Sequence, residues 1–328
     1  KNVTKANAAI TGTGNLYATG TINVTENGKA TADATVNGAV LSISGAKITF
    51  NDAKAEVVGT QDAFIGETGN ALKVKADGAI NVTSNFNNSS ETGAKSIVGS
   101  NAAGKGADVK LIGGTASTSK AVMDAKAGAH INGAEILAGG ALNVQTNARS
   151  YALADVLKPN GSMSLANVTV LVSNADAKGD FEAKINADSI TADSLNVGVN
   201  YYSDANAMTG PAGSSTADLN GASIKTNVAN ALADTVSDSA VSVKDITING
   251  AANVKDTGYV KSNAEGRSIN FTIDVAKLTV NTISSDLKTV QNAAFTYSGT
   301  AKIGGALNVL SEVVNDGTYG TSTAITNG

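Results

Sequence analysis

Residues 139–147 read Gly-Gly-Ala-Leu-Asn-Val-Gln-Thr-Asn, and the chain returns to this pattern throughout its length. Clear copies of its core are Ile80-Asn81-Val82, Leu142-Asn143-Val144, Leu195-Asn196-Val197 and Leu307-Asn308-Val309, and weaker copies begin at Ile22 and Ile248. The first aliphatic residues of successive copies lie 53 to 62 residues apart. A unit of this length repeated along 328 residues predicts a stacked array. We therefore expect residues 1–328 to form one continuous array. Since the repeat is under way at both ends, we also expect it to be a segment of a longer chain.

Within each unit, apolar and polar residues alternate with a period of two, as in residues 71–76 and 241–244. This alternation predicts short strands with one buried face. Asn-Gly pairs recur at 27–28, 37–38, 132–133, 160–161, 220–221 and 249–250, and they are typical of tight turns. The motif always returns in the same sense, whereas hairpins would invert it. We therefore predict an all-β parallel β-solenoid.

The distance between copies suggests two turns per unit. At about 4.8 Å per turn this gives a narrow rod of about a dozen turns, about 60 Å long. Leu142 and Val144 should point inward and Asn143 outward. Equivalent asparagines would then lie about 10 Å apart, too far to bond to one another directly.

Each motif is followed by a more polar stretch, at 86–105, 148–162 and 201–215. We expect these stretches to leave the solenoid as loop insertions on one side. Residues 227–234 could form one or two helical turns.

Composition narrows the function classes. Cysteine and tryptophan are absent and aromatic residues make up 4%, which favours a thin interior of Ala, Val, Ile and Leu. The 24 Lys and Arg against 28 Asp and Glu form no basic stripe, so we do not expect a nucleic-acid partner. No run approaches the roughly 18 apolar residues of a membrane span.

Few residues are candidates for catalysis. His130 is the only histidine, faces outward by parity, and has no cysteine or second histidine with which to bind a metal or activate a nucleophile. Carboxylates cluster at Asp176, Asp180 and Glu182, and at Asp234 and Asp238 around Ser237. We interpret them as solvated side chains. We therefore expect no catalytic, cofactor-binding or metal-binding residue, and no enzyme activity. Only the repeat motif supplies key residues, as structural positions: Ile80, Asn81, Val82, Leu142, Asn143, Val144, Leu195, Asn196, Val197, Leu307, Asn308 and Val309.

The Leu-Asn-Val strands, Asn-Gly pairs and Ala, Thr, Ser and Asp filler resemble the large filamentous-haemagglutinin-like exoproteins of Gram-negative bacteria. These are proteins of two-partner secretion, and they include leukotoxin-like relatives. The resemblance implies a right-handed β-helix, secreted and held at the cell surface, that presents regions for attachment or toxicity. No functional residue can be transferred from it.

The first hypothesis is the structural shaft of an adhesin or extracellular filament. Its ligand would be a glycan or protein on a host or neighbouring cell. End-to-end or lateral self-association would follow from unpaired edges. A cytotoxic exoprotein is the alternative, and a polysaccharide-cleaving β-helix enzyme is a third, which would need carboxylates on adjacent turns.

Overall fold

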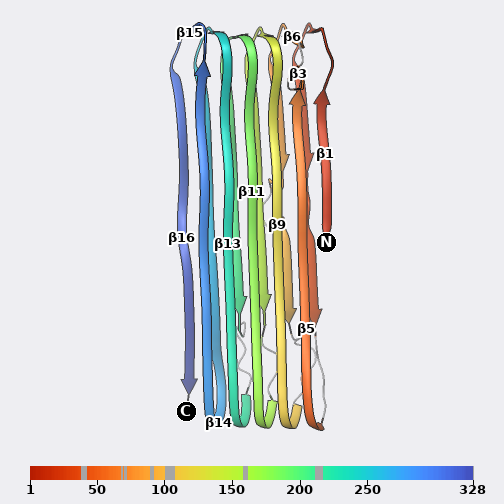
Figure 1. Ribbon diagram of the computed structural model, residues 1–328, viewed down its shortest axis with the longest axis vertical. Coiled ribbons are helices and arrows are strands. Elements are labelled where there is room, and N and C mark those ends of the chain that lie inside the picture. Colours follow the sequence, from red (N-terminus) through yellow and green to blue (C-terminus); the bar gives the residue numbers. More distant parts are fainter. Residues whose placement is uncertain are drawn as a thin grey trace.

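The computed structural model describes residues 1–37, 43–67, 69, 72–88, 92–99, 108–157, 162–210 and 217–327. In this part of the chain the secondary structure is all β, and the strands pair in parallel. The chain winds as a flattened coil whose two broad sides are parallel sheets, so the predicted parallel β-solenoid is confirmed. In Figure 1 the nearer strands run upward, the fainter ones run downward, and successive turns advance from right to left, which is a right-handed winding.

One side of the coil, which we call the long sheet, contains strands of up to about 30 residues. Its members are β1 (Asn2–Ile10), β5 (Ile43–Ile65), β9 (Asp108–Ala138), β11 (Ser162–Ala192), β13 (Ala217–Ile248) and the second half of β14 (Ala252–Tyr297). Three short strands continue it at one end: β2 (Asn15–Ala18), β6 (Lys73–Ala76) and β15 (Ala301–Ile303).

The opposite side, the short sheet, carries the repeat motif at the start of each turn. It contains β3 (Ile22–Gly28), β4 (Ala32–Asn37), β7 (Ile80–Phe86), β8 (Ala94–Gly99), β10 (Ala141–Val156), β12 (Ser194–Thr209), the first half of β14 and β16 (Leu307–Asn327).

Each repeat unit makes one turn, so the expectation of two turns per unit is wrong. Leu142 pairs directly with Leu195, and Leu195 pairs with Ala252. Six turns are therefore stacked, over about 24 Å at 4.8 Å per step. A 31-residue strand such as β11, at about 3.3 Å per residue, is about 100 Å long. The strands, and not the coil axis, lie along the longest dimension, and the segment is a broad slab instead of a narrow rod (Figure 1).

The turns are wide because much of the sequence that was predicted to form loop insertions forms strand instead. Residues 94–99, 148–156 and 201–209 are strand, belonging to β8, β10 and β12, and residues 227–234 lie in β13 and are not helical. The remainder of the predicted insertions lies mostly outside the described residues. Asn-Gly pairs at 27–28, 132–133 and 220–221 also lie inside strands, whereas Asn249-Gly250 follows β13 at a turn. The pairs at 37–38 and 160–161 include residues outside the described part.

The polar stretches form strands because their inward positions hold small residues. In β10 the inward side chains include Ser150, Ala152 and Ala154, all fully buried. Ser150 Oγ donates a hydrogen bond to the carbonyl of Lys178 in the facing sheet, at 2.8 Å. Ser173 donates likewise to the carbonyl of Ala154, at 2.7 Å. A buried hydroxyl with such a partner carries little desolvation penalty.

The interior is thin and contains mainly aliphatic residues, as composition predicts. Its few aromatic rings lie against glycines. A Cβ added to Gly59 would lie 2.3 Å from Cζ of the buried Phe86. The ring fits because position 59 carries no side chain.

Candidate functional site

The repeat motif forms a continuous hydrogen-bonded column on the outside of the short sheet. Its aliphatic residues point inward as predicted: Leu142 and Val144 are fully buried, as are Ile80 and Val82. The asparagine side chains point outward, and each amide nitrogen donates to the amide oxygen one turn earlier. The bonds run Asn81 to Asn23 (2.8 Å), Asn143 to Asn81 (2.7 Å), Asn196 to Asn143 (2.8 Å), Asn253 to Asn196 (2.9 Å) and Asn308 to Asn253 (2.9 Å).

Two sequence predictions about this column are wrong. The asparagines bond to one another, because one turn separates them, where two turns were expected. The fifth copy of the motif begins at Ala252 and not at Ile248, since Ala252 pairs with Leu195 and Leu307. The sequence pattern missed this copy because alanine occupies the position that leucine or isoleucine holds in the other copies. The last copy, at Leu307 and Val309, lies on the outermost strand β16 and is partly exposed.

Shorter ladders of the same kind lie elsewhere on both sheets. Asn85 donates to Asn27 at 2.8 Å and Asn147 donates to Asn85 at 2.9 Å, on the same strands as the main ladder. On the long sheet, Asn230 donates to Asn174 at 2.9 Å. The outward amides of these ladders therefore bond from turn to turn, and the ladders are structural.

The carboxylates singled out in the sequence lie on the outer face of the long sheet, among lysines from neighbouring turns. Asp180 pairs with Lys126 at 3.4 Å. Lys184 Nζ contacts Glu182 at 2.8 Å and Asp238, one turn along, at 2.9 Å. The nearby carboxylates Glu182 and Asp238 are thus joined through a shared ammonium group. Exposed pairs of this kind contribute little stability individually.

Asp176 and Asp234 are not brought into this pair. Asp234 is aligned with Lys178 on one side and Lys288 on the other, which gives an alternating column of charge. Asp176 is aligned with Leu232. Ser237 points inward, away from the flanking aspartates, and is buried.

His130 points outward as predicted and is half-buried between strands β5 and β11, in register with Phe64 and Lys184. Burial lowers the pKa of its imidazole, and the nearby Glu182 and Asp62 carboxylates partly oppose this shift. The ring is therefore neutral around pH 7. It lies beside the lysine-bridged carboxylates without a hydroxyl or thiol nucleophile in register with it.

Aromatic side chains form a second outward column on the short sheet. Arg149, Tyr202 and Tyr259 occupy equivalent positions on β10, β12 and β14. The guanidinium carbon of Arg149 lies 4.1 Å from the Tyr202 ring centroid, and the two tyrosine rings stack at 4.6 Å with 7° between their planes. The hydroxyl of Tyr259 donates to Asp316. Both faces of Tyr202 are covered, so its ring is not available for a stacking ligand such as a sugar.

Two acids that the sequence analysis did not single out point into the interior. Glu26 and Asp256 lie in the same inward column, on β3 and β14, and both are buried. Burial raises the pKa of Asp256 to about 7, and burial together with the charge of Asp62 raises the pKa of Glu26 to about 7. Ser237 and the Gln291 amide donate to Asp256 Oδ1, at 2.9 and 3.0 Å.

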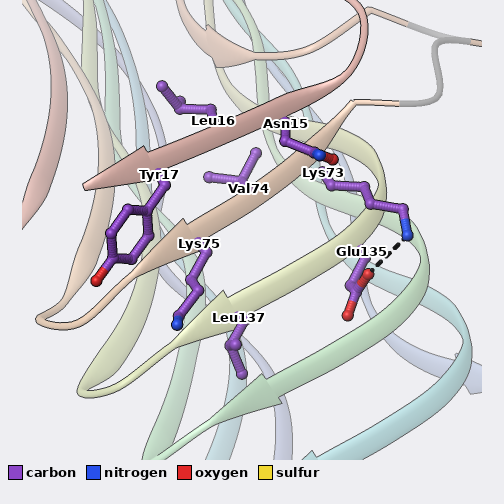
Figure 2. Close-up of a pocket in the computed structure, with 8 residues that line it drawn as sticks. All are labelled: Asn15, Leu16, Tyr17, Lys73, Val74, Lys75, Glu135 and Leu137. Carbon is purple, nitrogen blue, oxygen red and sulfur yellow. Dashed lines mark ion pairs between the residues drawn. The ribbon is translucent and has the colours of Figure 1, made fainter. Parts of the chain in front are cut away.

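A surface groove of about 310 Å³ crosses the first turns at β2, β6 and β9 (Figure 2). Its charged side chains and its tyrosine are engaged with neighbouring side chains. Lys73 pairs with Glu135 at 3.1 Å, and Lys75 Nζ lies 4.8 Å from the centroid of the Tyr17 ring. The Tyr17 hydroxyl donates to Asp77, and this hydrogen bond raises the pKa of Tyr17. The volume is at the lower end for small-ligand pockets, and the groove is open to solvent.

Within the described ranges, three or more His, Asp or Glu side chains do not come together in a way that could hold a metal ion. Nor does the described part contain a helix long and apolar enough to cross a membrane. Comparison of the chain with protein-family models, curated proteins and solved structures gives no match. The architecture therefore defines the class, a right-handed parallel β-solenoid with one wide turn per repeat. The resemblance to filamentous-haemagglutinin-like exoproteins stays a prediction.

Proposed function

We propose that this chain is part of the structural shaft of a secreted adhesin or extracellular filament, held at the surface of a Gram-negative bacterium. Such a shaft holds an attachment region away from the cell. Its ligand would be a glycan or protein of a host or neighbouring cell.

The observation that carries this proposal is the asparagine ladder, which runs without interruption through all six turns. A side-chain column that bonds only to itself supports continuity from turn to turn and leaves few of its groups for a ligand. The lysine-bridged carboxylates and the stacked tyrosines likewise contact one another and leave few of their groups for a ligand. Stacked repeats of this type derive their stability from nearest-neighbour contacts, which suits a scaffold of adjustable length.

The polysaccharide-cleaving alternative would use Glu182 and Asp238, the carboxylates on adjacent turns. Both hold Lys184, at 2.8 and 2.9 Å, which lowers their value as a proton-donating acid and a free base. The cytotoxic alternative draws no specific support from the described residues.

The test is the removal of one turn. Residues 142–194 can be deleted so that Ala141 is followed by Leu195, because Ala141 pairs with Ser194 and the register is preserved. A shaft predicts a folded, β-rich protein with one turn fewer, and an unchanged level of attachment when the unshortened and shortened chains are displayed on beads and offered to host cells. Loss of folding in the shortened protein would contradict a modular scaffold.

Activity assays separate the alternatives. The intact protein should release no reducing ends from a panel of acidic and neutral polysaccharides and should not lyse leukocytes at micromolar concentration. Release of reducing ends that is lost in Glu182→Gln would establish the enzyme, and lysis would establish the toxin. Either result would overturn the proposal.

A further inference from the structure

In the first part of the long-sheet strands from β5 onward, apolar and polar residues exchange the faces that they occupy along most of the coil. In β5 the outward residues Ile48 and Phe50 are 68% and 77% exposed, while the polar Lys47 and Thr49 point inward. In β13 the outward Ile224 is 46% exposed, and its neighbours Ser223 and Lys225 are buried. Apolar side chains therefore face solvent here although polar ones are buried, which the packing of the coil itself does not require.

These residues line up across five turns. Ile48 of β5 is followed in register by Gly114, Val168, Ile224 and Leu278. We name this surface the apolar tract and define it by Ile48, Phe50, Ile112, Val168, Ile224 and Leu278, all of which are exposed. Five strands at 4.8 Å and three outward positions along each strand give a face of about 24 by 20 Å, or about 500 Å². The largest apolar patch on a typical soluble monomer is of this size, and it is often functional.

The tract has both a ridge and a hollow. A groove of about 330 Å³ runs across Ala166, Ala222 and Ala276 on three consecutive turns. Ile48 and Phe50 stand at the other end of the tract, where the neighbouring turn has Gly114 and Ala116. The groove is flanked by Val168, Ile224 and Leu278, so large side chains lie beside the alanines on one face, which allows two such faces to interdigitate.

The tract differs from the rest of the same face in its lack of charged outward side chains. The outward positions that define it carry no charged side chain, whereas the outward positions further along the strands carry the Lys126–Asp180 and Lys184–Asp238 ion pairs. Lys277 is the charged residue among those that line the groove, and it alternates along β14 with the outward Ala276 and Leu278. A flat face with a 4.8 Å repeat is best matched by a second sheet face at about 10 Å.

We propose that the apolar tract is a lateral self-association surface, on which a second copy of this chain packs its own tract face to face. Two tracts would bury about 1,000 Å² in total, which is the lower bound for a specific interface. The contact is therefore expected to be weak in a two-copy assembly. It does not depend on the shaft hypothesis, since it follows from the surface alone.

The chain offers a matched pair of substitutions to test this. Ile224 and Val236 are outward residues of the same strand, 46% and 44% exposed, but only Ile224 lies in the tract. Sedimentation velocity from 1 to 200 µM should show a reversible dimer for the unmodified protein. Ile224→Glu should weaken dimerisation at least tenfold, and Val236→Glu should leave it unchanged. Far-UV circular dichroism and thermal unfolding should be the same for all three proteins, since both positions are exposed.

A second measurement locates the contact. Because the chain has no cysteine, Ile224→Cys and Val236→Cys each introduce a single thiol. Ile224→Cys should form a disulfide-linked dimer under mild oxidation, or give a short inter-spin distance after labelling, and Val236→Cys should do neither. A protein that is monomeric at 200 µM, equal weakening by the two glutamates, or a dimer whose thiols approach at Val236 would overturn the proposal. So would flotation of a monomeric protein with zwitterionic vesicles, which would assign the tract to a lipid surface.

Discussion

Replacing Asn196 by alanine removes two bonds from the middle of the asparagine ladder. The Asn196 amide donates to Asn143 at 2.8 Å and accepts from Asn253 at 2.9 Å. A net contribution of about 1 kcal/mol per hydrogen bond gives a loss of about 2 kcal/mol, with some offset from the freed side chain. Asn308→Ala, on the last turn, removes one bond and should cost about half as much.

The loss should be local, because stacked repeats interact mainly with their neighbours and need not unfold in one step. Amide hydrogen exchange, followed by mass spectrometry on peptides from β10, β12 and β14, is therefore the appropriate assay. Protection should fall in all three strands for Asn196→Ala. Gln145→Ala is the control, since Gln145 is an outward, exposed residue of β10 two positions beyond the ladder.

Asn196→Asp removes only one of the two hydrogen bonds. The carboxylate still accepts from Asn253 but cannot donate to Asn143, and it places negative charge against the Asn143 oxygen. We expect it to destabilise at least as much as alanine. If Asn196→Ala proved no more harmful than Gln145→Ala, the ladder would not stabilise the coil and the argument for a self-supporting shaft would lose its basis.

Further predictions concern the interior. Because the folded-state pKa of Asp256 is raised to about 7, the folded protein binds a proton that the unfolded chain releases, so stability should decline as pH rises from about 4 to 7. Asp256→Asn should make that decline shallower in urea unfolding followed across the pH range, leaving the share that Glu26 contributes; an unchanged pH profile would contradict the buried carboxyl. Gly59→Ala should cost about 1–3 kcal/mol by overpacking against Phe86, seen as a lower unfolding midpoint, and Gly59→Ala combined with Phe86→Leu should recover part of it. Ser150→Ala should cost about 1 kcal/mol, since it leaves a carbonyl of the facing sheet without this hydroxyl, and an unchanged midpoint would show that the cross-link contributes nothing.

The sequence predicted the repeat, the parallel stacking and the inward and outward residues of the motif, because periodicity of two and of about 55 residues is written directly in residue types. It did not predict the width of a turn. Residues 148–156 look polar in composition, and their regular alternation of small inward residues was the signal that they form strand. Once that signal is read, one wide turn per unit follows, and so does the asparagine ladder.

The two buried acids could also have been predicted from the alternation of inward and outward residues along each strand. Glu26 lies two residues after the inward Val24, and Asp256 two residues after the inward Val254. The apolar tract could not have been found in this way. Strand alternation shows that two faces differ, but which face is covered depends on where the short sheet ends, and that is a property of the assembled coil.

One turn per unit also determines how this chain can fold. Paired strands are separated by 53 to 66 residues, so bringing the first two turns together requires closure of a long loop before any ladder bond forms. Every later turn then finds an existing edge with its amides and carbonyls already aligned. Folding should therefore show a slow nucleation step followed by rapid addition of turns. A chain that emerges progressively from a membrane pore could use its first completed turn as the template for all that follow.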